Sequence, residues 1–344
     1  MAIRVAINGL GRIGRSFLRV ASSRPEIEIV AVNDLGDVEN LAYLLKYDSA
    51  QGRFAKDVFA KSGSDPKIVV DRKEIAFLSV KEPSELPWKK FDIDIVVEST
   101  GVFAEYEKSK PHLVAGAKRV VITAPVKNEA PEGVAGVTVL MGINEDKLQT
   151  CDISSNASCT TNAGSPIIQI LHEAIGIEKA VLNTVHGYTA TQALVDSPAK
   201  GDFRRGRAAA QNIIPSSTGA AIATTKAITD LEGKFDGVAM RVPVITGSIA
   251  DITFVAKRST NVEEVNEILR VAVGETRWKN IFSTTDEQIV SSDIIGSTYA
   301  SIADLSFTRV VDNDLVKVLA WYDNEMGYTH ALVEHVIKSG SYIK

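Results

Sequence analysis

A glycine-rich segment, Gly9–Gly14 with the sequence G-L-G-R-I-G, restricts the fold of this chain more than any other feature. It follows a short β-prone run, Ile3–Asn8, and precedes a helical pattern over Arg15–Ala21. A second strand-like run, Ile27–Val32, is followed by Asp34, 20 residues after the last of these glycines. This order is the dinucleotide-binding pattern, in which glycines let a pyrophosphate approach backbone N–H groups at a helix N-terminus. A glycine-rich turn without a ligand is the alternative, and the flanking strands and acid favour a cofactor site.

Predicted strands and helices alternate through the rest of the first half. The helices cover Val38–Tyr47 and Tyr106–Ala115, and the strands cover Ile68–Val70, Ile75–Leu78, Ile93–Glu98, Val120–Ile122 and Val137–Met141. Strands that stop at Gly, Ser or Thr turns are typical of a parallel sheet with its ligand at the carboxyl ends of the strands. The pattern predicts an α/β Rossmann domain with a doubly wound parallel sheet.

The second half has a different pattern. One predicted helix ends near Ile175, and strand-like runs then dominate, covering Ala180–Val185, Val238–Val242, Ser248–Ala256 and Leu315–Trp321. They predict an α+β domain with a mixed or antiparallel sheet. A long polar loop, Thr189–Pro215, interrupts these strands, and loops of that length inside a domain are usually functional.

A cysteine in a polar segment is the first candidate for chemistry. Cys159 lies between hydroxyl and amide residues, just before an apolar helical run. At a helix N-terminus, backbone N–H groups and the helix dipole stabilise the reactive thiolate. Pro166 leaves open whether the helix bends there or starts later. A lone cysteine in a polar run is more often inert than catalytic. A catalytic role requires a base nearby, and the candidate is His186, at a strand end 27 residues further on.

Arginines and hydroxyls form a second candidate group. They occur in Arg204–Arg207, in Ser216–Gly219 and at Arg241. Read separately, they are a solvated loop, a helix cap and a strand arginine. Read together, they supply the charge-assisted donors that one or two phosphates need.

Composition narrows the possible classes of protein. The 344 residues, 45% of them hydrophobic, are enough for two domains. The net charge of −5 argues against a surface that binds polyanions as a whole. No apolar run approaches the roughly 20 residues that cross a bilayer, and the N-terminus lacks the layout of a signal peptide. Two cysteines eight positions apart make neither a disulfide framework nor a zinc site, so we expect a reduced, cytosolic setting and no metal.

Four further motifs carry a resemblance to a known family. They are S-N-A-S-C-T-T-N at 155–162, H-G-Y-T-A-T-Q at 186–192, I-I-P-S-S-T-G-A-A at 213–221 and W-Y-D-N-E-M-G-Y at 321–328. With the opening I-N-G-L-G-R-I-G-R, they closely resemble the phosphorylating glyceraldehyde-3-phosphate dehydrogenases along essentially the whole chain. The resemblance implies an NAD-binding Rossmann domain (1–158 and 323–344), a catalytic domain (159–322) and a cytoplasmic homotetramer. It implies no nucleic-acid or membrane partner.

The resemblance also implies the site residues. Cys159 matches the nucleophile and His186 its base. The cofactor positions are Gly9, Gly11, Arg12, Ile13, Asp34, Lys81, Thr123 and Asn324. Those for the substrate phosphate are Thr189, Thr191 and Arg241, and those for inorganic phosphate are Ser158, Thr160, Arg204, Thr218 and Gly219. The chain departs from the family at Ala163, Met326 and Gly187, none of which removes a group that the mechanism needs.

The implied reaction is the oxidation of D-glyceraldehyde 3-phosphate with NAD and phosphate to 1,3-bisphosphoglycerate through a cysteine thioester, in glycolysis or gluconeogenesis. Two alternatives remain: an erythrose-4-phosphate dehydrogenase, in which hydrolysis replaces phosphorolysis, and a non-catalytic dinucleotide-binding protein. For the cofactor, Leu35 and Pro198 match residues that accompany NAD in the family. Gly36 and Ser197 are small and leave room for some NADP activity.

Overall fold

The structure, a computed structural model, describes residues 2–343 and divides into two compact units. The first comprises the residues up to Val139, Asn144–Ala157 and the residues from Leu332 on. The second comprises Leu140–Ile143 and Ser158–Ala331. This division groups the C-terminal end of the chain with the N-terminal unit. The exact domain limits expected from the sequence stay a prediction.

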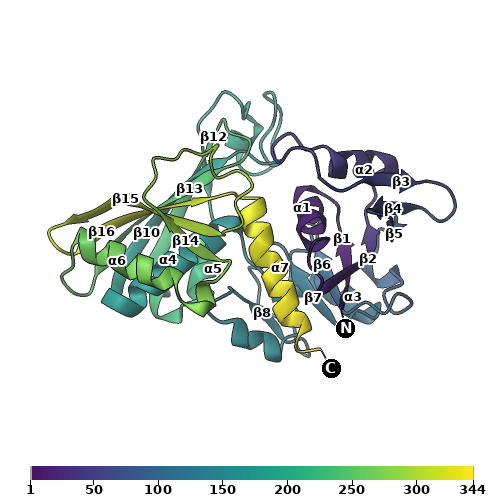
Figure 1. Cartoon of the computed structure of the whole chain (residues 1–344), viewed down its shortest axis with the longest axis horizontal. Helices are drawn as coiled ribbons and strands as arrows, with labels where there is room; N and C mark the ends of the chain where they lie inside the picture. The colour runs from purple at the N-terminus through teal and green to yellow at the C-terminus, as the bar shows by residue number, and fades with distance from the viewer. Residues whose placement is uncertain (1, 344) are drawn as a thin grey trace. The chain divides into compact units, whose positions relative to one another are not determined.

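The first unit contains a nine-stranded sheet in the order β3-β4-β5-β2-β1-β6-β7-β9-β8 (Figure 1). In the part of this order that runs from β5 to β8, neighbouring strands pair in parallel. At the other edge, β3 and β4 pair antiparallel. The strands are β1 (Ile3–Asn8), β2 (Ile27–Asn33), β3 (Val58–Lys61), β4 (Lys67–Val70), β5 (Lys73–Leu78), β6 (Ile95–Glu98), β7 (Arg119–Ile122), β8 (Gly136–Thr138) and β9 (Ile153–Ser155). This is the predicted Rossmann architecture.

Three helices accompany that sheet: α1 (Arg12–Ala21), α2 (Val38–Lys46) and α3 (Tyr106–Val114). Helix α1 contacts β2, α2 contacts β3 and β4, and α3 contacts β7 and β9. The expected start of the first helix at Arg15 is wrong, since α1 begins three residues earlier, inside the glycine motif. The expected strand over Val137–Met141 is also shorter, because β8 ends at Thr138.

The second unit contains a mixed seven-stranded sheet in the order β11-β12-β10-β13-β16-β15-β14. Its strands are β10 (Ile177–Gly187), β11 (Ile214–Ser217), β12 (Phe235–Val242), β13 (Ser248–Ala256), β14 (Phe282–Thr285), β15 (Ser301–Val311) and β16 (Leu315–Tyr322). Helices α4 (Cys159–Ile175), α5 (Ala220–Ala227) and α6 (Val262–Val273) pack against it (Figure 1). Alternating burial along β13 and β16 shows that one face of this sheet forms the core.

Helix α4 settles the question that Pro166 raised. It begins at Cys159 and runs without interruption to Ile175, with Pro166 inside it. Pro166 removes one intrahelical donor. The hydroxyl of Ser165 donates to the carbonyl of Thr161 at 2.6 Å, adding a bond beside the gap. The helix therefore neither bends enough to break nor starts later.

The last helix, α7 (Met326–Gly340), ends in the first unit. There Arg24 donates to Glu334 at 2.7 Å, and Gly340 lies so close to Ile3 that a Cβ would come within 2.3 Å of its side chain. Its C-terminal part therefore packs on the N-terminal strand.

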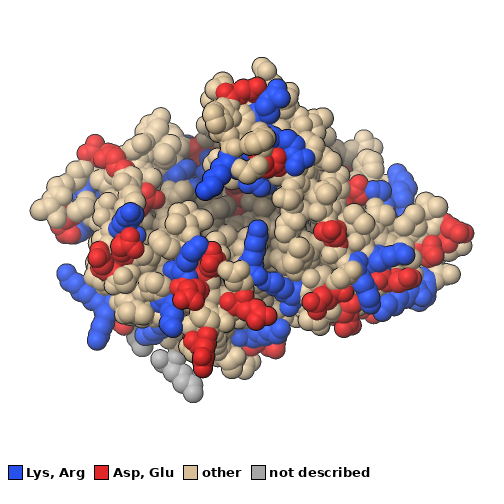
Figure 2. Space-filling model, turned by 180° about the vertical axis from the view of Figure 1, so that it is seen from behind, with Lys and Arg blue, Asp and Glu red and all other residues tan. Residues whose placement is uncertain are grey.

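Surface charges of opposite sign are interspersed on the face shown in Figure 2. Exposed ion pairs of the chain include Arg258 with Glu264 and Arg270 with Asp286. Among residues 2–343, no helix is both long and apolar enough to cross a lipid bilayer.

The glycine motif yields a stability prediction. A Cβ on Gly14 would lie 2.1 Å from the carbonyl oxygen of Gly9, and a backbone atom cannot move aside. A Cβ on Gly11 would meet no heavy atom within 4 Å. We therefore expect Gly14→Ala to lower the free energy of unfolding by about 1–3 kcal/mol or more. Gly11→Ala, the matched control, should stay within about 0.5 kcal/mol of the wild type in urea denaturation. Equal stability of the two variants would contradict the close approach.

Candidate functional site

The carboxyl ends of β1, β2 and β6 form one candidate site in the first unit. In the sheet register, Asn8 lies between Asn33 and Glu98, the last residues of the neighbouring strands. A pocket of about 490 Å³ opens there. Its lining includes the predicted cofactor residues Gly9, Gly11, Asp34 and Lys81, and also Asn8, Asn33, Leu35, Val80, Glu82, Ser99, Thr100, Val102 and Phe103.

Backbone donors fix the carboxylate of Asp34 at this pocket. Its two oxygens accept from the amides of Leu10, at 2.6 Å, and Gly36, at 2.8 Å. Leu35 is 64% exposed beside it. The acid is therefore held at the strand end, where the fingerprint predicts it.

A buried hydrogen-bond network lies beneath the pocket. The Asn33 amide donates to the Asn8 side chain at 2.7 Å, and the Asn8 amide donates to Glu98 at 2.6 Å. The other oxygen of Glu98 accepts from the backbone amide and the hydroxyl of Thr100. These bonds tie together the ends of three strands and the turn after β6.

A histidine completes this network. Trp88 Nε1 donates to His112 Nδ1 at 3.0 Å, so the ring proton of a neutral His112 is on Nε2. That nitrogen lies 3.2 Å from Glu98 and donates to it. In the sequence, the part of this network that a pattern indicates is the turn Ser99-Thr100-Gly101 at the end of a strand. The roles of Trp88 and His112 carried no sequence signal.

Three predicted cofactor residues of the first unit do not line this pocket. Arg12 pairs with Asp48 at 3.1 Å, Ile13 is half-buried in α1, and Thr123 follows β7, where its amide donates to the backbone carbonyl of Glu98 at 3.0 Å. Their roles stay predictions.

The second unit brings the predicted nucleophile and base together. Cys159 is the first residue of α4, and its Sγ lies 3.3 Å from Nε2 of His186 near the end of β10. Ser158 caps the helix by accepting from the amide of Thr161 at 3.1 Å. A free thiol, an imidazole and a capped helix N-terminus thus meet in one place.

Arg241 lies next to this pair because β10 and β12 run in parallel with His186 opposite Arg241. Its Nη1 is 2.5 Å from His186 Nδ1 and donates to the carbonyl of Gly187 at 3.2 Å. His186 Nδ1 is 2.6 Å from the same carbonyl, so the imidazole, the guanidinium and the carbonyl of Gly187 meet beside the thiol.

The two ionisable groups of the pair are both shifted toward neutrality. Burial, with the charge of Arg241 second, lowers the pKa of His186 to about 3. Burial also raises the pKa of Cys159, while Arg241 acts in the opposite direction. For comparison, burial raises the pKa of Cys151 to about 11. Without ligands, the pair is therefore a thiol beside a neutral imidazole.

Asn324 is oriented by two neighbours that sequence reasoning missed. Ser248 donates to Asn324 Oδ1 at 2.8 Å, and Thr246 lies 3.3 Å from the same oxygen. The Ser248 hydroxyl also accepts from the amide of Gly187 at 3.2 Å. Because its carbonyl oxygen is engaged, Asn324 presents its amide nitrogen for other contacts.

The remaining predicted phosphate residues are placed as follows. Thr189 contacts Thr191 at 2.9 Å, and Arg204, largely exposed, pairs with Asp202 at 2.8 Å. Near α5, Thr218 is half-buried and its hydroxyl oxygen accepts from the amide of Ala220, and Gly219 is exposed. Thr160 is buried, and its hydroxyl lies 2.9 Å from that of Tyr322. Its role as a phosphate ligand stays a prediction.

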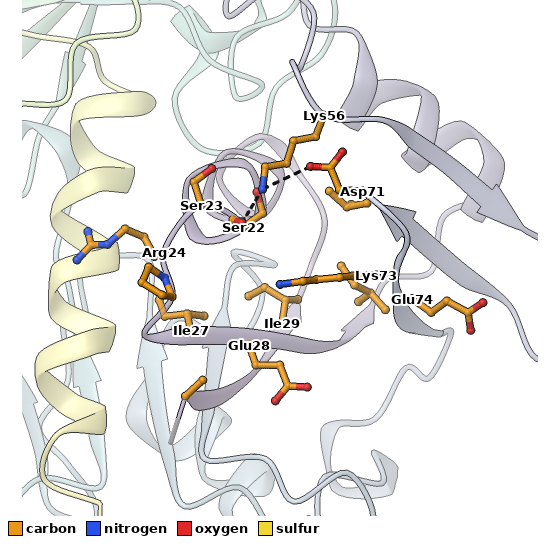
Figure 3. A pocket seen from close by; sticks show the side chains of 14 residues that line it. Ser22, Ser23, Arg24, Ile27, Glu28, Ile29, Lys56, Asp71, Lys73 and Glu74 are labelled. Atoms are coloured by element: carbon orange, nitrogen blue, oxygen red, sulfur yellow. Dashed lines mark hydrogen bonds and ion pairs between the residues drawn. The ribbon is translucent and has the colours of Figure 1, made fainter.

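A further pocket of about 760 Å³ lies between the end of α1, the start of β2 and β5 (Figure 3). Lys56 donates there to the carbonyl of Ser22 at 2.6 Å and lies 3.8 Å from Asp71. The ammonium group is thus already paired, and nothing in the lining indicates a ligand. Within residues 2–343, no group of three or more His, Cys, Asp or Glu side chains is arranged to hold a metal ion.

Both halves of the chain match known family models. Residues 3–106 match "Glyceraldehyde 3-phosphate dehydrogenase, NAD binding domain", and residues 158–324 match the C-terminal domain of the same family. A glyceraldehyde-3-phosphate dehydrogenase of Geobacillus stearothermophilus is 46% identical over 336 residues, 97% of each chain. One from Streptomyces coelicolor is 45% identical over 99% of each chain, and glyceraldehyde-3-phosphate dehydrogenase 3 of Saccharomyces cerevisiae is 44% identical over 98% of this chain and all of its own.

The lowered pKa of His186 predicts a pH dependence of stability. A histidine whose folded pKa is about 3 and whose unfolded pKa is about 6.5 contributes its full stability above pH 6.5 and loses it as the pH falls toward 3. Between pH 6.5 and 5 this loss is about 1–2 kcal/mol. We expect the free energy of unfolding of His186→Asn to fall by about 1–2 kcal/mol less than that of the wild type between pH 6.5 and 5. Parallel curves for variant and wild type in urea titrations would mean that His186 is charged in the folded protein.

Proposed function

Because the chain belongs to the glyceraldehyde 3-phosphate dehydrogenase family, we propose that it oxidises D-glyceraldehyde 3-phosphate with NAD and inorganic phosphate to 1,3-bisphosphoglycerate. It is an NAD-binding oxidoreductase. The observation that carries the proposal is the approach of Cys159 Sγ to His186 Nε2, at 3.3 Å. A thiol and a base in this arrangement suit acyl chemistry through a thioester.

The residues at the strand ends of the first unit fit NAD. Gly9 has a φ of 95°, and a Cβ there would lie 2.7 Å from the amide of Thr100, so only glycine lets these turns pack together. Gly11 lines the pocket without a side chain that would fill it. Asp34 would accept hydrogen bonds from the adenosine ribose, and Asn324 would donate to the nicotinamide carboxamide. When bound, NAD supplies the acceptor for the substrate's hydride.

The chain's own residues account for the covalent steps. Cys159 gives its proton to His186, the thiolate adds to the aldehyde carbon, and His186 returns the proton to the resulting oxyanion to form a hemithioacetal. His186 then takes the proton from the hemithioacetal hydroxyl as the carbon loses its hydride, which leaves a thioester on Cys159. The amide of Cys159, in the first turn of α4, is a donor for the developing oxyanion.

Phosphate completes the reaction. An oxygen of inorganic phosphate attacks the thioester carbonyl, the C–S bond breaks, and Cys159 leaves as a thiolate. Thiolates are good leaving groups, which is why cysteine serves here where serine does not. Arg241, beside His186, would hold a phosphate with Thr189 and Thr191, while Arg204 and the start of α5 would hold the other.

A homotetramer and a cytoplasmic location belong to the same proposal. The loop after β10 carries four apolar side chains that are 69–81% exposed, namely Leu194, Val195, Phe203 and Ile213. Such clusters are usually covered by another protein surface, and a second copy of this chain is the occupant that the family suggests. Two free cysteines fit a reducing compartment. Sedimentation analysis tests the assembly.

One assay tests the reaction and the assignment of the thiol. We expect NADH formation from D-glyceraldehyde 3-phosphate to depend on phosphate, and Cys159→Ser to lower kcat by at least about 10³-fold while NAD still binds. Cys151→Ser is the matched control and should retain wild-type kcat, since that thiol is buried. Phosphate-independent oxidation would instead favour hydrolysis of the thioester, as in an erythrose-4-phosphate dehydrogenase. Loss of activity in the Cys151 variant alone would overturn the assignment.

Asp34 and Leu35 predict a preference for NAD over NADP. The Asp34 carboxylate, held by the amides of Leu10 and Gly36, would repel a 2′-phosphate. We expect a higher kcat/KM with NAD, and a shift of the ratio toward NADP when Leu35→Thr is combined with Pro198→Ser. A wild-type preference for NADP, measured by steady-state kinetics with both cofactors, would contradict this.

A further inference from the structure

His112 is a fully buried histidine in the last turn of α3, and the proposed reaction gives it no role. Its Nδ1 accepts from Nε1 of Trp88 at 3.0 Å, so a neutral ring carries its proton on Nε2. Nε2 lies 3.2 Å from Oε2 of Glu98 and donates to it. Trp88 is itself fully buried in the core of the first unit. The indole therefore fixes the ring so that the imidazole presents one donor to the carboxyl group of Glu98.

Glu98 connects this ring to the segment 99–103, which forms one wall of the pocket of about 490 Å³. Its Oε1 accepts from the backbone amide of Thr100 at 2.8 Å and also from the Thr100 hydroxyl. The hydroxyl oxygen of Thr100 accepts in turn from the amide of Val102 at 3.0 Å. Thr100 and Val102 both line the pocket. One oxygen of Glu98 thus holds the start of the wall, and His112 donates to the other.

His112 also contacts the far end of the 99–103 wall. The ring of Phe103 meets the imidazole edge-on, with ring centroids 6.4 Å apart and ring planes at 85°. The carbonyl of Phe103 accepts from the hydroxyl of Ser109, three residues before His112 on α3, at 2.7 Å. In the middle of the wall, a Cβ on Gly101 would meet no heavy atom within 4 Å, and Val102 is exposed. The wall is therefore attached at its two ends, both of which reach His112.

The same carboxyl group is linked to the opposite side of the pocket. Asn8 donates at 2.6 Å to Oε2 of Glu98, the oxygen that His112 also contacts. The side-chain oxygen of Asn8 accepts from Asn33 at 2.7 Å. Asn33 exchanges two hydrogen bonds with the backbone of Val80, both at 2.9 Å, and Val80 lines the pocket. Hydrogen bonds therefore link His112 to residues on both sides of the pocket.

Loss of the His112 donor loosens these attachments. A buried carboxylate that loses a donor is unfavourable, and it recovers a hydrogen bond only by moving or by admitting water. Either change displaces Thr100, because its amide and hydroxyl are bound to the other oxygen of the same rigid group. The pocket then spends part of its time in conformations that do not bind ligand. The apparent Kd rises as the reciprocal of the binding-competent fraction.

We propose that His112 is a positioning residue for cofactor binding: through Glu98 and Phe103, it holds the 99–103 wall of the pocket in the conformation that binds NAD. This inference rests on the proposed function, because that function assigns the pocket to NAD. It concerns the affinity for NAD rather than the chemical step. His112 is therefore distinct from the residues that react with the substrate.

Two substitutions at His112 differ in the ring nitrogen that they replace. His112→Gln carries an amide near the position of Nε2 and can still donate to Glu98. His112→Asn is shorter, so it keeps an acceptor near Nδ1 for Trp88 and places no donor beside Glu98. His335→Asn is the matched control, because His335 is also a fully buried histidine of the first unit and does not line the pocket.

The readouts are the Kd for NAD from calorimetric titration and the hydrogen exchange of backbone amides in 99–103 without ligand, both well below the unfolding temperature. We expect His112→Asn to raise the Kd about tenfold and to speed exchange at Thr100 and Val102 at least about threefold. Its kcat at saturating NAD should stay within about twofold of the wild type. The Kd of His112→Gln should rise by less than about threefold, and that of His335→Asn should stay within about twofold.

Three outcomes would show that His112 only packs in the core and would overturn the proposal. They are a Kd of His112→Asn within about twofold of the wild type, an equal rise in His335→Asn, and equal Kd values for the Asn and Gln variants of His112. Should His112→Asn not fold, Trp88→Phe replaces it, since this change removes the donor to Nδ1 and keeps an aromatic side chain. We expect its Kd to rise at least about threefold, and an unchanged Kd would be equally fatal.

Titration with NAD needs neither substrate nor turnover. A wild-type protein that binds NAD but forms no NADH from D-glyceraldehyde 3-phosphate would therefore refute the proposed function. The comparison of the His112 variants would still test positioning in that case.

Discussion

The carboxyl group of Glu98 ties together the strand ends and the turn that form the proposed cofactor pocket of the first unit. It accepts from Asn8 on the neighbouring strand, from Thr100 in the following turn and from His112 on α3. A buried carboxyl group without such donors is strongly unfavourable, so none of these elements can move away alone without a penalty. Asn33 extends the network to β2, next to Asp34. The pocket at the strand ends is thus built on a rigid, fully hydrogen-bonded base rather than on loops alone.

Much of the first unit could be predicted because its signals are local. The glycine motif, the strands on either side and the acid follow one another in the sequence, and each has a steric or hydrogen-bonding reason that acts over a few residues. The first helix began earlier than expected, because Arg12–Gly14 lacks an apolar pattern. Strand β9, with three residues, is too short to show any periodicity. Its position became visible only from its pairing with β7 and β8.

The second unit shows where sequence reasoning ends. Cys159 and His186 were both recognised as candidates, but their contact depends on how α4 packs on the sheet that contains β10, which no local pattern encodes. The same holds for Arg241, which reaches His186 through the parallel pairing of β10 with β12. Ser248 gave no signal, although it links Asn324 to the backbone beside His186. Local chemistry named the reacting groups, and strand register brought them together.

The burial of Cys151 has a consequence for the response of this chain to oxidants. One of the two cysteines is Cys151, and burial raises the pKa of its thiol to about 11. Position 163 is an alanine and provides no third sulfur close to the nucleophile. A sulfenic acid formed on Cys159 would therefore find no reactive thiol in its own chain with which to make a disulfide. Its rescue would depend on a small thiol from solution, so that recovery would follow the thiol concentration of the compartment rather than any property of the fold.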